Sequence, residues 1–132
     1  METKEFDKKY RQRLEKLATT NIADAMDKVG IRGAVIGIRP MYDCPKITGR
    51  AVTIKITAAG AVASKYHLGV RAIDAASSGD VIIIDNRGDL NNTCWGEILS
   101  MGSKMKGIVG VVVDGAARDI VRETANAFGG LD

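Results

Sequence analysis

The sequence is poor in the residues on which disulfide-stabilised and zinc-dependent folds rely. It has two cysteines, two prolines, one histidine and 5% aromatic residues among 132 residues. Cys44 and Cys94 form no C-x-x-C pattern, so neither a disulfide framework nor a zinc site is indicated. We therefore expect free thiols in a reducing compartment.

Long hydrophobic runs are also missing. No apolar stretch approaches the roughly 20 residues that a membrane-spanning helix needs. Residues 1–9 are charged and lack the apolar core of a signal peptide. We therefore expect a cytoplasmic protein with no membrane partner.

Length and charge are those of an ordinary globular chain. Its 132 residues suit one domain, and its 45% hydrophobic content is typical of such domains. The net charge of +3 does not by itself indicate nucleic acid. A basic cluster near the start suits an RNA contact or, as we favour, a solvated helix face. The cluster consists of Lys8, Lys9, Arg11 and Arg13.

Two helices are predicted in an N-terminal region covering residues 4–30. Apolar residues recur with helical spacing over residues 4–17. Thr19 or Thr20 is expected to cap a second helix, which Gly30 ends. The buried stripe of this second helix is predicted to contain Ile22, Ala25, Met26 and Val29.

Residues 31–132 alternate between strand and helix patterns, which indicates an α/β core with a largely parallel sheet. A dinucleotide-binding fold is disfavoured because no G-x-G-x-x-G follows any expected strand. Strands are predicted over residues 35–38, 51–57, 81–84 and 108–113.

Three helices are predicted among these strands. One covers residues 66–76, with Tyr66, Val70 and Ile73 on its apolar face. A short one covers residues 120–128. Another begins near Trp95, and its apolar face is predicted to contain Trp95, Ile98, Leu99, Gly102 and Met105.

The start of the helix near Trp95 has the features of an anion site. Gly96 and Glu97 lie at or near its first turn, where backbone N–H groups lack helical partners. The free N–H groups include those of Ile98 and Leu99. Together with the positive end of the helix dipole, they favour a bound anion.

Arg118 and Asp119 follow the strand predicted over residues 108–113, so they lie at the edge of the sheet where ligands tend to bind. Arg118 offers a planar guanidinium that suits a carboxylate. Asp119 offers hard oxygen atoms to a divalent cation such as Mg²⁺. The set fits a 2-oxo acid, because a metal polarises a keto oxygen.

Several of these residues suit a structural role as well. Arg118 and Asp119 also fit the cap of a following helix. His67, the single histidine, suits catalysis or, as we favour, a surface or capping position. Asp85 and Asp89 would either orient Arg118 or a water molecule, or bond backbone N–H groups in a turn.

The sequence resembles the RraA-like family in two places. Residues 95–99 read Trp-Gly-Glu-Ile-Leu, and twenty residues, 98–117, separate Glu97 from Arg118-Asp119. The early segment Thr-x-x-Ile-x-Asp-Ala at residues 19–25 is also similar. The family includes class II 4-hydroxy-4-methyl-2-oxoglutarate aldolases and the regulator of ribonuclease E activity. The aldolases usually have Asp at the position of Glu97.

The resemblance implies a fold and an assembly. The fold is the layered β/β/α swivelling-domain fold, here C-terminally shortened, because family members usually continue with further strands and a last helix. A single RraA-like domain over residues 1–132 is expected. Family sites lie between subunits, so a homo-oligomer, either a trimer or a hexamer, is implied.

The resemblance also implies a function. It is a lyase, dependent on Mg²⁺ or Mn²⁺, that forms pyruvate from 4-hydroxy-2-oxo acids or from oxaloacetate. Arg118 would bind the pyruvate carboxylate, Asp119 would hold the metal, and Glu97 would take the acidic position. The alternative is a non-catalytic regulator that binds a ribonuclease or an RNA helicase. The implied site contains Gly96, Glu97, Ile98, Leu99, Arg118 and Asp119.

Overall fold

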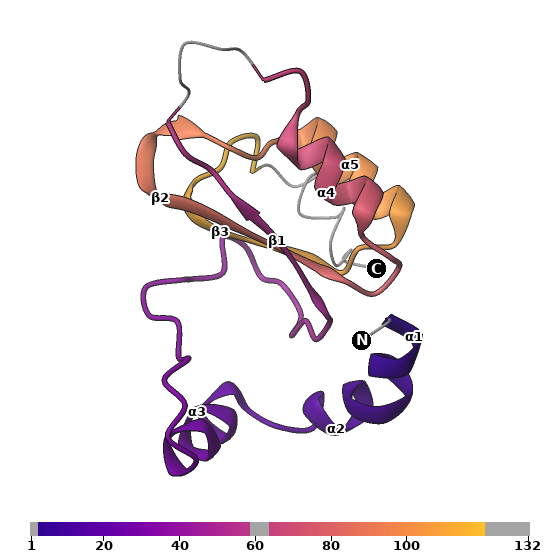
Figure 1. The fold of residues 1–132 in the computed structure, drawn as a ribbon, viewed down its shortest axis with the longest axis vertical. Helices are drawn as coiled ribbons and strands as arrows, with labels where there is room; N and C mark the ends of the chain where they lie inside the picture. Colours follow the sequence, from indigo (N-terminus) through magenta and orange to yellow (C-terminus); the bar gives the residue numbers. More distant parts are fainter. Residues whose placement is uncertain (1–2, 59–63, 121–132) are drawn as a thin grey trace.

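The computed structural model describes residues 3–58 and 64–120. Within these residues, a parallel sheet carries two helices on one face, and further helices precede it in the chain (Figure 1). The predicted α/β class is confirmed. The helix predicted over residues 120–128 lies outside the described residues, except for Ile120.

The sheet has the strand order β1-β2-β3, so β2 is central. β1 (Ala51–Lys55) and β3 (Gly110–Ala116) each pair in parallel with β2 (Val81–Thr93). Parallel strands need long crossover connections, and each crossover here contains a helix. These helices are α4 (Leu68–Ala75), after β1, and α5 (Glu97–Lys106), after β2.

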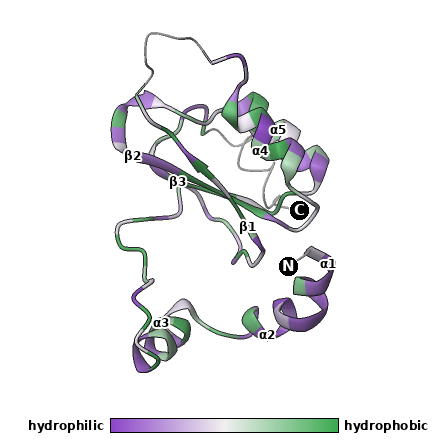
Figure 2. Cartoon of the chain, viewed as in Figure 1, coloured by the Kyte–Doolittle hydropathy of each residue, from purple (hydrophilic) through white to green (hydrophobic). Residues whose placement is uncertain are grey.

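The hydrophobic core lies between the sheet and these two helices (Figure 2). Ile82 and Ile84 of β2 are 0% and 1% exposed, so the predicted buried strand over residues 81–84 is confirmed. Burying each such side chain stabilises the fold by roughly 1.5–3 kcal/mol. The other members of the core are Ile54, Ala72, Ala76, Trp95 and Ile108.

A helical segment at the N-terminus replaces the single helix predicted over residues 4–17. It consists of α1 (Thr3–Phe6), a π-helical turn η1 (Asp7–Arg11) and α2 (Gln12–Leu14). Arg11 attaches the segment to the loops before β1 and β2, because it donates to the carbonyl groups of Thr48 and Gly79 at 2.8 and 2.6 Å. Arg11 therefore has a structural role within the predicted basic cluster.

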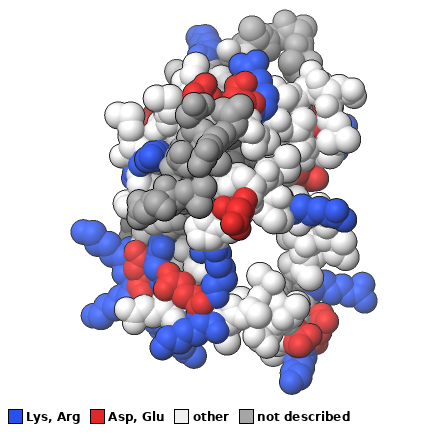
Figure 3. Space-filling model, turned by 180° about the vertical axis from the view of Figure 1, so that it is seen from behind, with Lys and Arg blue, Asp and Glu red and all other residues white. Residues whose placement is uncertain are grey.

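The rest of that cluster is consistent with a solvated helix face. Lys8, Lys9 and Arg13 are exposed. In Figure 3, basic side chains over the lower part of the molecule, where α1 to α3 lie, are interspersed with acidic ones. This mixture does not form a surface of one sign, so it does not favour nucleic acid.

The prediction of a buried second helix was wrong in two respects. α3 (Thr19–Lys28) forms where expected, but its N-cap is Ala18, whose N–H donates to Asn21 Oδ1 at 3.0 Å. Thr19 and Thr20 are inside the helix. None of the described residues of α3 is buried. The predicted stripe is half-buried at Ile22 and Met26 and exposed at Ala25 and Val29.

The strand predicted over residues 35–38 does not form. Val35 and Ile36 are 78% and 94% exposed, and no strand of the described chain pairs with them. β-branched residues favour strands only where a neighbouring strand and a buried face are available. Residues 19–41, which contain no buried residue, therefore form an arm of α3 and extended chain beside the core.

The apolar faces predicted for α4 and α5 are buried only in part. Trp95 belongs to the core and Ile73 and Leu99 pack against it, but other predicted members are exposed. Tyr66 precedes α4 and is exposed, as is Val70. In α5, Ile98 and Met105 are 85% and 88% exposed. The buried residues of these helices are small: Gly69 and Ala72 in α4, and Ser100 and Ser103 in α5. Small residues allow both helices to lie close to the sheet.

No helix in the described ranges, 3–58 and 64–120, has the length and apolar character needed to cross a membrane.

Asp80 joins the N-terminal segment to the sheet. Its carboxylate is 0% exposed and accepts from Arg50 Nη2 at 2.6 Å, from Thr3 Oγ1 at 2.9 Å and from the Ser77 N–H at 2.9 Å. Burial by itself raises the pKa of Asp80, but these hydrogen bonds and the charge of Arg50 outweigh it and hold the pKa below its usual range.

The substitution Asp80→Asn is expected to lower the free energy of unfolding by about 2–3 kcal/mol, because it removes charged hydrogen bonds at a buried site. Since the folded pKa is lowered, the stabilisation is present above the unfolded pKa and is lost as the pH falls through the folded value. Urea unfolding at pH 7 and at pH 3 measures both effects. Asp74→Asn, on the exposed side of α4, is the control and should change stability little. Equal unfolding curves for the two variants would contradict the role of Asp80.

Candidate active site

The two halves of the predicted site meet because β2 and β3 end side by side. Beyond the strands, the Cys94 N–H donates to the Ala116 carbonyl at 3.1 Å, and the Arg118 N–H donates to the Trp95 carbonyl at 3.0 Å. These bonds continue the parallel pairing of the two strands. The start of α5 and the Arg118-Asp119 pair therefore lie at the same edge of the sheet, as the sequence predicts.

Trp95 fixes the start of α5. Its side chain is 6% exposed and belongs to the core, and its indole Nε1 donates to Ser100 Oγ at 3.1 Å. Ser100 Oγ in turn donates to the Gly96 carbonyl at 3.1 Å. The buried indole and the buried serine thus hold the first turn of the helix to the sheet.

Gly96, the N-cap of α5, lies against the Arg118-Asp119 pair. A Cβ atom at position 96 would lie 2.9 Å from Asp119 Oδ2 and 3.3 Å from Arg118 Nε. The φ of Gly96 is −158°, an extended conformation that any residue adopts, so the close approach and not the backbone angle calls for glycine. The glycine allows the two side chains to reach the helix start.

Arg118 and Asp119 form an accessible charged pair. Arg118 Nε lies 3.3 Å from Asp119 Oδ2, and their side chains are 70% and 44% exposed. Asp119 has φ of 60°, in the left-handed region that aspartate tolerates better than most residues. Such conformations occur often at functional sites, where the surrounding structure imposes them.

The first turn of α5 has the free backbone N–H groups that the sequence predicts. Glu97, Ile98 and Leu99 are the first three residues of the helix, so their N–H groups precede the first helical hydrogen bond, from Ser100 N–H to the Gly96 carbonyl. Together with the guanidinium of Arg118, these groups can bind a carboxylate. The Glu97 side chain is exposed at this helix start.

The donors near Asp119 fit a cation that keeps most of its water. Among the described residues, no three His, Cys, Asp or Glu side chains come together. Mg²⁺ is often bound through one or two carboxylates, with water and the ligand completing the octahedron. Asp119, with an accessible carboxylate, can provide such a contact, whereas zinc, which prefers a closed set of nitrogen and sulfur ligands, does not suit these residues.

Asp85 and Asp89 bond backbone N–H groups and neighbouring side chains, as their structural interpretation predicts. Asp85 pairs with Lys55 at 2.8 Å and accepts from the Arg87 N–H, and the Lys55 bond is the main cause that lowers its pKa. Asp89 accepts from the Asn92 side chain and the Asn91 N–H, which lower its pKa.

Sequence reasoning missed Asn86, which is buried in the irregular part of β2 that also contains Asp85 and Asp89. Its Nδ2 donates to the carbonyls of Asn92 and Asp89 at 3.0 and 3.3 Å, and it lies against Gly115. Gly115 has φ of 148° and no room for a side chain beside Asn86. Asn86 thus shapes the chain just before Arg118. The signal in the sequence was a single amide after a buried strand, which many turns share.

Cys94 adjoins the site but does not resemble a nucleophile. Burial raises the pKa of its thiol, so the reactive thiolate is disfavoured. Its Sγ lies 3.7 Å from the Ala116 carbonyl. A structural role follows from these contacts.

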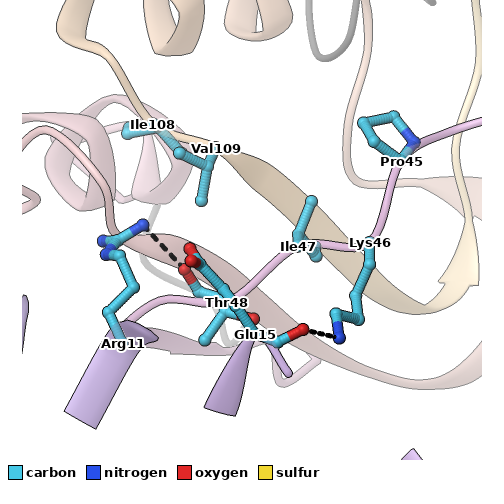
Figure 4. A pocket seen from close by; sticks show the side chains of 8 residues that line it. All are labelled: Arg11, Glu15, Pro45, Lys46, Ile47, Thr48, Ile108 and Val109. Carbon is cyan, nitrogen blue, oxygen red and sulfur yellow. Dashed lines mark hydrogen bonds between the residues drawn. The ribbon is translucent and has the colours of Figure 1, made fainter. Parts of the chain in front are cut away.

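A separate cavity of about 370 Å³ lies at the opposite, amino end of the strands (Figure 4). Its cationic side chains are turned to backbone carbonyls, Arg11 to Thr48 and Lys46 to Glu15. These side chains therefore stabilise the position of the N-terminal segment, and we do not assign a substrate to this cavity. The lining residues are Arg11, Glu15, Pro45, Lys46, Ile47, Thr48, Ile108 and Val109.

His67 is the N-cap of α4, which confirms the capping interpretation. Its Nδ1 accepts from the Gly69 N–H at 3.2 Å, and its φ and ψ are −80° and 118°, as for a residue that precedes a helix. The imidazole thus replaces one missing helical partner.

Replacing His67 with alanine is expected to lower the free energy of unfolding by about 1 kcal/mol, because the cap is lost. His67→Asn should retain most of the stability, since asparagine is a favourable N-cap residue. Thermal unfolding of both variants, followed by circular dichroism, measures the difference. Two variants that are equally destabilised would show that the imidazole acts through some other contact.

Three comparisons with known proteins agree on the family. The family model described as "RraA-like: Aldolase/RraA" matches residues 19–129. A protein of Halalkalibacterium halodurans, named "Putative 4-hydroxy-4-methyl-2-oxoglutarate aldolase", is 38% identical over 113 residues, which are 85% of this chain and 50% of that protein.

Solved structures give the same result. An uncharacterized protein from Pseudomonas syringae is similar with a TM-score of 0.76 at 33% identity, over 92% of this chain and 53% of its own. Streptomyces coelicolor RraAS2, described as an unusual member of the RNase ES inhibitor RraA protein family, has a TM-score of 0.75 at 25% identity, over 83% of this chain and 54% of its own. The chain spans about half the length of these relatives. From the matched residues and the shared fold, the chain belongs to the RraA-like family.

Proposed function

We propose that the chain carries the site of a divalent-metal-dependent lyase that forms pyruvate from 4-hydroxy-2-oxo acids, including 4-hydroxy-4-methyl-2-oxoglutarate, or from oxaloacetate. The observation that carries the proposal is the close approach at Gly96, where Asp119 Oδ2 and Arg118 Nε lie beside the open start of α5. A guanidinium, a carboxylate and free backbone N–H groups thus lie together at one accessible site. The aldolase name of the Halalkalibacterium relative supports the same activity.

Arg118 binds the substrate carboxylate in this proposal. Its side chain is 70% exposed, so the guanidinium is accessible to a ligand. Its backbone position is fixed by the hydrogen bond to the Trp95 carbonyl. The N–H groups of Ile98 and Leu99 supply further donors at the positive end of α5. The guanidinium and the backbone N–H groups together orient the substrate carboxylate. In this orientation the 2-oxo group of the substrate points toward Asp119.

Asp119 would hold the divalent cation, because its carboxylate is accessible and offers hard oxygen ligands. When bound, such a cation withdraws electron density from the 2-oxo group of the substrate. The cationic Arg118 adds to this stabilisation, because negative charge develops on the pyruvate part of the substrate as the bond breaks.

In the aldol cleavage, the bond between C3 and C4 breaks and its electron pair passes to the pyruvate enolate. The 4-hydroxyl proton is lost, and C4 leaves as a carbonyl group. Glu97, exposed at the helix start, accepts that proton directly or through a water molecule. In oxaloacetate, the C3–C4 bond breaks in the same direction with loss of CO₂. In both reactions, protonation of the enolate at C3 then gives pyruvate.

The test is an assay of pyruvate release from a panel of 4-hydroxy-2-oxo acids and oxaloacetate, with and without Mg²⁺ or Mn²⁺. Metal-dependent release from at least one acid supports the proposal. Pyruvate that binds while no acid is cleaved would overturn the lyase and leave a ligand-binding protein.

Arg118→Lys is expected to weaken the binding of pyruvate or oxalate about five- to a hundredfold, which corresponds to roughly 1–3 kcal/mol for a charged hydrogen bond. Lysine keeps the charge but loses the planar, two-pronged donor. Residual binding should survive, because the helix N–H groups remain. Calorimetric titration of both proteins at a fixed metal concentration measures the change. Equal affinities would show that Arg118 does not contact the carboxylate.

Asp119→Asn is expected to weaken Mg²⁺ or Mn²⁺ binding at least tenfold, since it keeps the size of the side chain but removes the charge that a hard cation needs. Metal titration by calorimetry gives the affinity, and circular dichroism checks that the fold is intact. Asp114→Asn, an exposed aspartate at the end of β3, is the matched control. Unchanged affinity in Asp119→Asn would place the cation elsewhere.

A further inference from the structure

The candidate site requires glycine at position 96, and glycine does little to fix the backbone there. A Cβ atom at this position would lie 2.9 Å from Asp119 Oδ2 and 3.3 Å from Arg118 Nε, so a larger residue does not fit. Glycine restricts its own φ and ψ less than any other residue does. The peptide group between Gly96 and Glu97 therefore needs other contacts to hold its orientation.

Ser100 supplies these contacts from the buried side of α5. Its backbone N–H and its Oγ both donate to the Gly96 carbonyl, each at 3.1 Å. Ser100 is 1% exposed, and its Oγ accepts from the Trp95 indole Nε1 at 3.1 Å. Trp95 is a member of the core, and its own carbonyl accepts from the Arg118 N–H. A chain of hydrogen bonds therefore connects the core to the Gly96 carbonyl.

The orientation of the Gly96 carbonyl determines the direction of the next N–H group. The peptide group is planar and trans, so the Glu97 N–H points opposite to the Gly96 carbonyl. That carbonyl points along α5 to Ser100, so the Glu97 N–H points back out of the helix start, where it has no helical partner. Arg118 and Asp119 lie against the same helix start. A rotation of this one peptide group would turn the N–H away from the site.

We propose that Ser100 is a positioning residue for the carboxylate of the 2-oxo acid: its hydroxyl fixes the Gly96–Glu97 peptide, so that the Glu97 N–H donates to that carboxylate. This role rests on the proposed function, because it concerns the same bound carboxylate. Ser100 is buried and does not contact the ligand; it acts through the peptide group. The backbone N–H of Glu97 is distinct from its side chain, which accepts the substrate proton in the proposed reaction.

The same helix offers a matched control. Ser103 also lies on the buried side of α5 and is 0% exposed, but its Oγ has no hydrogen-bond partner within the described chain. Ser100→Ala and Ser103→Ala therefore remove the same hydroxyl from the same side of one helix, and only Ser100→Ala breaks the link to Gly96. The backbone bond from residue 100 to the Gly96 carbonyl remains in Ser100→Ala, so α5 should persist by circular dichroism.

Nuclear magnetic resonance tests the hydrogen bonds without a ligand. Trp95 is the single tryptophan, so its indole N–H gives one signal in a proton–nitrogen correlation spectrum. Ser100→Ala removes the acceptor of this N–H, so its proton signal should move upfield. Ser103→Ala should leave the signal near its wild-type position. An indole signal that Ser100→Ala does not move would overturn the role of Ser100, because the link from Trp95 would not exist.

Calorimetric titration tests the effect on binding. Ser100→Ala should weaken the binding of oxalate at a fixed Mg²⁺ concentration about three- to tenfold, as for the loss of one hydrogen bond between uncharged groups. The affinity for Mg²⁺ alone should change less than about twofold, because the Asp119 carboxylate that offers the cation its oxygen ligands is retained. Ser100→Thr keeps a hydroxyl that can bond to the same carbonyl, so it should bind oxalate more tightly than Ser100→Ala. In the lyase assay, the loss should appear in KM rather than in kcat, since the carboxylate is held alike before and during bond cleavage.

The outcomes separate this role from the proposed function. Wild-type protein that binds neither oxalate nor pyruvate would overturn both. Equal oxalate affinities in Ser100→Ala and Ser103→Ala would overturn the positioning role alone, and so would an equal loss of Mg²⁺ and oxalate binding, which indicates general damage to the site. The titration does not depend on turnover, so a chain that binds oxalate but releases no pyruvate still decides the role of Ser100.

Discussion

The hydrogen bond from the Arg118 N–H to the Trp95 carbonyl joins the two parts of the candidate site. It exists because β2 and β3 run in parallel and end at the same edge of the sheet, so the residues that follow each strand continue side by side. Trp95, buried in the core, fixes one side of this bond, and the start of α5 follows directly. The positions of Gly96 and of the Arg118-Asp119 pair both follow from this single pairing.

Small residues determine how α5 lies on the sheet, and thereby what it presents to the outside. Ser100 and Ser103 face the core, and Ser100 also bridges Trp95 to the Gly96 carbonyl. Beside these serines only Leu99 among the large side chains of α5 packs against the core, whereas Ile98, Met101 and Met105 are exposed. The arrangement that orients the helix start at the site therefore also leaves these three apolar side chains exposed.

Much of the fold could be predicted from the sequence, because the strands are short, β-branched and separated by helical patterns. The buried strand at residues 81–84, the α/β class and the meeting of the helix start with Arg118-Asp119 were all accessible in this way. Periodicity also located α3 and α5, but it does not tell which face is covered. Ile98 and Met105 have helical spacing, yet they are exposed because close packing on the sheet favours serine. Val35 and Ile36 have strand propensity, but a strand needs a partner. The roles of Glu97, Arg118 and Asp119 remain predictions, since geometry places the groups without showing what they bind.

The arm formed by residues 19–41 has a consequence for the thermodynamics of the chain. None of these residues is buried and only a few, such as Ile22 and Met26, are half-buried, so they lengthen the polypeptide but add little to the apolar surface that becomes hydrated on unfolding. The heat-capacity change and the denaturant dependence both follow that surface rather than chain length. Calorimetric signals from this protein will therefore describe the sheet with α4 and α5, while the arm can gain or lose its helix without a visible transition.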